Sequence, residues 1–101
     1  MDVLALERLI ERGQDSYEAR LALGQAYLRQ AHSSKAIEHL EKATELSPEK
    51  TTAWQALGEA YLQEDQSTKA AEAWRWGIEV ATCNGDEQAK KVMQVWLKRL
   101  G

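Results

Sequence analysis

The sequence predicts an all-α fold, a stack of antiparallel helix hairpins with about six helices. The first observation is a repeat, because LGQAYL at residues 23–28 returns as LGEAYL at residues 57–62, an offset of 34 residues. The second is that the matching positions follow helical spacing. Similarity at a fixed period of this length indicates stacked supersecondary units, each burying its apolar face against a neighbour.

The composition indicates one globular domain covering 1–101. Of the 101 residues, 44% are hydrophobic and 29% are charged, and the net charge is −3. Basic residues occur in runs of at most two, which argues against nucleic-acid binding, and the apolar runs are too short to span a bilayer. The acidic N-terminus does not resemble a signal peptide, and a single cysteine excludes an internal disulfide, so we expect a cytoplasmic protein.

The N-terminal flank, residues 2–13, predicts one short helix that stops at Gly13. Its apolar residues are spaced for a single helical face, and they are Leu4, Leu6, Leu9 and Ile10. We interpret this segment as the second helix of an incomplete preceding unit.

The first full unit, residues 17–50, predicts a helix over 17–30 with Asp15 and Glu18 as a capping box. A second helix begins after Ser33 as the predicted N-cap. Ser47-Pro48 ends it, because proline lacks the amide hydrogen and disfavours helix in the residue before it.

The second full unit, residues 51–84, predicts the same scheme. A helix near 51–64 is followed by a second helix after Ser67, which Asn84-Gly85 closes. The remaining residues, 86–100, begin with Asp86 as a candidate N-cap and predict a terminal capping helix.

Two mid-helix glycines predict close helix packing. Overlaying residues 17–50 on 51–84 gives 12 identities, and Gly24 and Gly58 are one of the matched pairs. Because glycine costs about 1 kcal/mol relative to alanine inside a helix, its repetition needs a packing reason. We expect Gly24 and Gly58 to face the small residues Ala36 and Ala70 where two helix backbones approach closely.

These spacings resemble the tetratricopeptide repeat, whose signature places Trp, Leu-Gly, Tyr, Ala, Phe/Tyr, Ala and Pro within 34 residues. The matching residues of 51–84 are Trp54, Leu57, Gly58, Tyr61, Ala70 and Trp74. Those of 17–50 are Leu23, Gly24, Tyr27, Ala36, Leu40, Ala43 and Pro48. The C-terminal run also resembles short stand-alone bacterial members of this family. Ala31 and Asp65 stand at a turn position that is often glycine, so we expect altered turns there.

The resemblance implies that the first helices of successive units line a concave groove that binds a partner peptide or helix. On those helices, the faces left free by hairpin packing supply the candidate groove residues, which are Leu21, Gln25, Leu28, Arg29, Gln55, Glu59 and Leu62. Leucines mixed with polar side chains suit an extended or helical peptide. The alternative is that the leucines only pack between units. The resulting prediction is a non-catalytic protein–protein adaptor.

Two tryptophans outside the repeat pattern, Trp76 and Trp96, leave two interpretations open. They either pack between the helix over 68–83 and the capping helix, or they form an exposed patch. An exposed patch rich in tryptophan favours self-association. The alternative function is therefore a homo-oligomeric structural module, and we expect a monomer or a weak homodimer.

No set of residues predicts catalysis, a metal site or a cofactor. His32 and His39 lack a third ligand at suitable spacing, and Cys83 lacks an adjacent base. The sequence also contains no glycine-rich phosphate loop. We therefore predict that the protein is not an enzyme.

Overall fold

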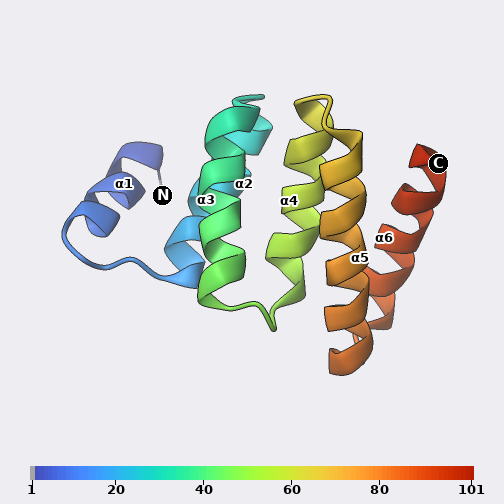
Figure 1. The fold of residues 1–101 in the computed structure, drawn as a ribbon. Helices are drawn as coiled ribbons and strands as arrows, with labels where there is room; N and C mark the ends of the chain where they lie inside the picture. The colour runs from blue at the N-terminus through green and yellow to red at the C-terminus, as the bar shows by residue number, and fades with distance from the viewer. Residues whose placement is uncertain (1) are drawn as a thin grey trace.

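A computed structural model describes residues 2–101, which form six helices joined by short turns (Figure 1). Their bounds are α1 Val3–Glu11, α2 Tyr17–Arg29, α3 Ser33–Leu46, α4 Thr51–Gln63, α5 Ser67–Asn84 and α6 Glu87–Leu100. The predicted all-α stack of hairpins is confirmed, and the helices begin and end close to the bounds expected from the sequence.

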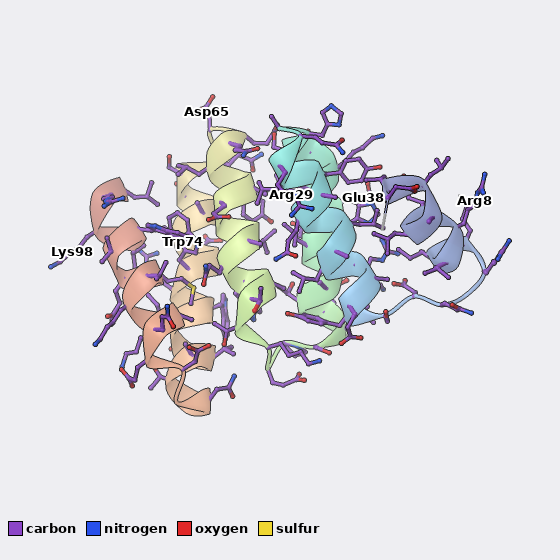
Figure 2. The ribbon with its side chains drawn as sticks, turned by 180° about the vertical axis from the view of Figure 1, so that it is seen from behind. Arg8, Arg29, Glu38, Asp65, Trp74 and Lys98 are labelled. Atoms are coloured by element: carbon purple, nitrogen blue, oxygen red, sulfur yellow. The ribbon has the colours of Figure 1, made fainter. Side chains whose placement is uncertain are left out.

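The helices pack in chain order. α2 pairs with α3 and α4 with α5, while α3 contacts α4 and α5 contacts α6. In Figure 1 α3 and α5 lie in front, with α1 and α6 at opposite ends of the stack. Figure 2 shows the other side, where α2, α4 and α6 face the viewer. The stack measures 39 × 28 × 18 Å.

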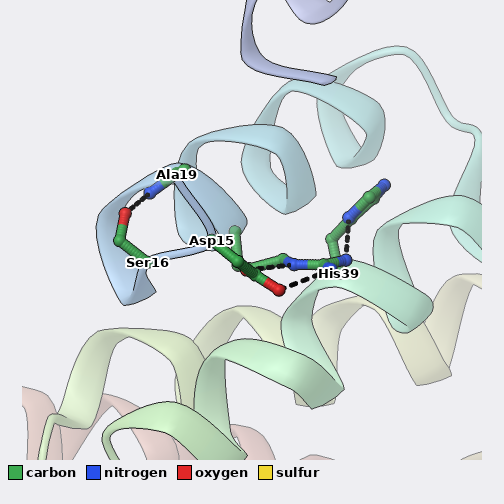
Figure 3. Close-up of polar contacts among 5 residues, drawn as sticks. Asp15, Ser16, Ala19 and His39 are labelled. Atoms are coloured by element: carbon green, nitrogen blue, oxygen red, sulfur yellow. Dashed lines mark hydrogen bonds and ion pairs between the residues drawn. The ribbon is translucent and has the colours of Figure 1, made fainter. Parts of the chain in front are cut away.

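The predicted capping box of α2 is wrong. The helix begins at Tyr17, so Ser16 is the N-cap and its Oγ accepts a hydrogen bond from the Ala19 amide at 3.1 Å. Asp15 lies one residue too early and instead pairs with Arg20, whose Nε donates to Oδ1 at 2.8 Å (Figure 3). The Arg20 guanidinium lowers the pKa of Asp15.

A polar cluster joins α2 to α3 beside this N-terminus. Arg20 Nη1 lies 3.0 Å from His39 Nδ1 (Figure 3). Arginine can only donate, so Nδ1 accepts and the His39 ring is neutral in this arrangement. Desolvation and the Arg20 charge both lower the pKa of His39, and its ring stacks on Tyr27 at 5.7 Å. His39 therefore has a structural role in this cluster.

The turns inside both hairpins differ from the prediction in their caps. Ala31 and Asp65 adopt left-handed backbone, with φ of 60° and 58°. These altered turns were expected. Ser33 and Ser67 are the first helical residues rather than N-caps, because the next residue after the left-handed one occupies the cap position. Ser33 Oγ instead donates to the Glu64 carboxylate in the neighbouring unit.

The two glycines face large side chains, so the expected pairing with Ala36 and Ala70 is wrong. A Cβ on Gly24 would overlap the side chain of Leu40, and one on Gly58 would overlap the Trp74 indole. Leu40 and Trp74 are almost completely buried. Glycine is therefore required because a bulky side chain of the second helix lies directly over the first helix backbone.

Two tyrosines tie each unit to the one before it. Tyr27 in α2 donates its hydroxyl to Glu7 of α1 at 2.8 Å, and Tyr61 in α4 donates to Glu41 of α3. Both partners are separated by the repeat offset, so Glu7 occupies the place in α1 that Glu41 occupies in α3. This equivalence supports our interpretation of α1 as the second helix of a preceding unit.

Candidate functional site

The predicted groove residues of α2 lie mostly against the core. Leu21 and Leu28 are half-buried and pack on the buried cluster. Gln25 is also half-buried, whereas Arg29 is exposed. The Leu28 carbonyl accepts a hydrogen bond from Gln63 Nε2 of α4 at 3.4 Å, which ties α2 to α4. For Leu21 and Leu28, packing accounts for the apolar side chain.

The predicted residues of α4 line a cleft of about 600 Å³ that opens between α4 and α6. Its walls and floor are formed by Glu59, Leu62, Gln63, Trp74, Trp96, Arg99 and Leu100. We call this the α4–α6 cleft. It lies on the side of the molecule seen in Figure 2, where Trp74 is found between α4 and α6.

Aromatic and aliphatic side chains form the base of the α4–α6 cleft. Trp74 is 2% exposed, and its indole N–H donates to the Gln55 carbonyl of α4 at 3.1 Å, which fixes the ring. Trp96 of α6 packs on it, with ring centroids 5.3 Å apart and planes at 50°. Leu62 on the opposite wall is 41% exposed. The cleft therefore offers a rigid apolar base with an accessible leucine beside it.

One carboxylate and one guanidinium border this apolar base. Glu59 is half-buried, and desolvation raises the pKa of its carboxyl. Within residues 2–101 no lysine or arginine forms an ion pair with it. Arg99 of α6 is exposed at the cleft and likewise has no ion pair in the described chain. A half-buried carboxylate without a cation is the unusual feature of this site.

The sequence reasoning missed the contribution of α6 to the cleft. Trp96, Arg99 and Leu100 follow i, i+3, i+4 spacing, which places them on one helical face. That spacing was a usable signal. It was missed because the groove was expected only between the first helices of the two full units, and α6 was interpreted as a cap.

Comparison with known proteins identifies the architecture. A model of the tetratricopeptide repeat family matches residues 3–32 and 21–75. The chain belongs to this family. It is 34% identical over 100 residues to a TPR repeat-containing protein of Pseudomonas aeruginosa, covering 99% of this chain and 95% of that protein. The solution structure of a protein from Bordetella parapertussis is 31% identical, with a TM-score of 0.85, covering 99% of this chain and 87% of that chain.

Membership of the tetratricopeptide repeat family supports a general role. Proteins of this family generally mediate protein–protein interactions and are generally non-catalytic scaffolds. Both relatives are bacterial. In residues 2–101, no three His, Cys, Asp or Glu side chains gather where they could hold a metal ion, and no helix has the length and hydropathy needed to cross a membrane.

The two additional tryptophans of this tetratricopeptide repeat chain have different surroundings. Trp96 packs in the α4–α6 cleft, as one interpretation expected. Trp76 does not contact α6 in this way; it is 57% exposed and stacks on Trp54 with ring centroids 6.1 Å apart. Trp74 and Trp76 are two positions apart on α5, so they point to nearly opposite sides of the helix. A single patch containing both Trp76 and Trp96 is therefore wrong.

Proposed function

We propose that this chain is an adaptor that holds a peptide or helix of a protein partner in the α4–α6 cleft. The supporting observation is the cleft itself, where an exposed leucine lies beside a tryptophan base and a half-buried carboxylate has no cation. Concave apolar sites with a few placed polar groups are typical of ligand binding. Gln25, Gln55 and Arg29 stay predicted contacts, for a partner that extends along α2.

The test is affinity capture from the native cell lysate with the wild-type protein and with Leu62→Arg as baits. Leu62 is 41% exposed, so arginine there fills the cleft without opening the core. Circular dichroism should show the same helix content and melting temperature for both baits. Leu21→Arg is unsuitable as a control because Leu21 packs against the core.

A protein retained only by the wild type is then purified and titrated against both forms, with tryptophan fluorescence as the readout. Trp96 lines the cleft, so occupancy should change its emission. Equal capture by both baits, or a titration with no effect of Leu62→Arg, would contradict binding in the cleft.

A further inference from the structure

We propose that the α4–α6 cleft selects a peptide segment that presents an apolar side chain and a lysine or arginine on the same face. The inference rests on the proposed function, since it gives the partner chemistry for the same cleft. The apolar side chain would contact Leu62, Trp96 and Leu100, and the cation would pair with Glu59.

The apolar part follows from what the cleft leaves open to solvent. Leu62 is exposed on α4, while Trp96 and Leu100 are half-buried on α6 above Trp74. An aliphatic or aromatic side chain between these walls removes apolar area from water on both sides. Burial of one such side chain contributes roughly 1.5–3 kcal/mol, which makes it a natural anchor for a short segment.

The charge preference follows from the unequal burial of Glu59 and Arg99. Glu59 is partly removed from water, so its interaction with a ligand charge is screened less than that of the exposed Arg99. A lysine or arginine at Glu59 restores the interactions that the carboxylate loses on burial. An acidic residue near Arg99 gains less because water and salt screen the guanidinium.

The indole of Trp96 favours the same ligand. It lines the cleft together with Glu59, and tryptophan is the aromatic side chain that binds cations best over its face. The aliphatic stem of a lysine or arginine also packs well on an aromatic ring while its charged end reaches a carboxylate. A basic side chain is therefore recognised by both its stem and its charge.

The experiment is a selection from a random peptide library displayed on phage, with three immobilised forms of the full chain. Wild type is compared with Leu62→Ser, which removes the apolar wall without adding charge, and with Glu59→Gln, which removes only the charge. Glu79→Gln on exposed α5 surface is the matched control. Melting curves establish that each form is folded before selection.

We expect wild type and Glu79→Gln to enrich peptides with lysine or arginine near an apolar residue. Glu59→Gln should lose the basic preference and bind a selected peptide about tenfold more weakly, as for loss of one charge-assisted hydrogen bond. Enrichment over Leu62→Ser without a basic preference would overturn this inference but leave the adaptor proposal intact. Equal recovery on wild type and Leu62→Ser would overturn both.

Discussion

Ala31 pays a conformational penalty that the other turn partly avoids. Both Ala31 and Asp65 have left-handed backbone, but alanine has no side-chain group to stabilise that conformation, whereas aspartate tolerates it better. Each turn is also exposed, so a substitution changes few packing contacts. The two positions therefore form an internal comparison of backbone strain in equivalent turns.

We predict that Ala31→Gly increases the free energy of unfolding by about 1 kcal/mol. Asp65→Gly should increase it less. Urea denaturation of both variants beside wild type measures the difference. A loss of stability in Ala31→Gly would mean that the greater freedom of glycine in the unfolded chain outweighs the strain relieved in the turn.

Glu59 is a second residue whose position opposes stability. Its pKa is raised by burial, so the folded chain binds a proton at Glu59 more readily than the unfolded chain does. Its stabilising effect is full below the unfolded pKa near 4.5 and is lost as the pH rises through the folded pKa. At neutral pH the ionised carboxylate therefore lowers stability, which is a common property of binding residues.

We predict that Glu59→Gln is more stable than wild type at pH 7, by about 0.5 kcal/mol because half of the side chain remains in water. The advantage should shrink as the pH falls toward 4, where Glu59 is protonated. Chemical denaturation across this range tests it. Glu79→Gln serves as the exposed control, and an advantage of Glu59→Gln that persists at low pH would contradict a charge effect.

Within the helix hairpins, stability depends on which side chain covers each glycine. Gly58 lies under the Trp74 indole, which is fixed by its hydrogen bond to the Gln55 carbonyl, while Gly24 lies under the more adaptable Leu40. A methyl group at either site gains helix propensity worth about 1 kcal/mol but forces the covering side chain to move. The rigid indole should make that movement more costly.

We predict that Gly58→Ala lowers the free energy of unfolding by about 2 kcal/mol, and Gly24→Ala by less. Thr52→Ala, at an exposed position of the same helix as Gly58, measures the gain in helix propensity alone. Urea titrations followed by tryptophan emission report both stability and movement of Trp74. Unchanged stability in Gly58→Ala would show that the ring shifts toward the α4–α6 cleft at little cost.

The helices of this chain were predictable because each boundary has a local cause. Apolar periodicity, Pro48 and the left-handed Gly85 define them without reference to tertiary structure. The caps were not predictable to the residue, since a left-handed turn shifted Ser33 into the helix. The cleft depends on the placement of α6, which begins 36 residues after α4, although α4 begins 34 residues after α2. Periodicity alone cannot place a helix that leaves the repeat.

Across the whole chain, the stack contacts are between neighbours, so the end helices protect the units beside them. α6 buries Met93 completely, with its sulfur against Gly77 of α5, and places Trp96 on Trp74. α1 buries Leu6 and accepts the Tyr27 hydrogen bond at Glu7. The two ends are therefore unequal, with the larger apolar contact at the C-terminal end.

We predict that deleting residues 86–101 lowers the free energy of unfolding by more than about 4 kcal/mol, since loss of a buried methionine alone costs roughly 2–5 kcal/mol and Trp74 is uncovered as well. Deleting residues 1–13 should cost about half as much. Met93→Ala, which keeps α6 in place, should fall between wild type and the C-terminal deletion. Thermal and urea denaturation followed by circular dichroism measure all three. Equal losses from the two deletions would mean that the units contribute equally along the stack, and that α6 is needed to form the cleft rather than to hold the fold.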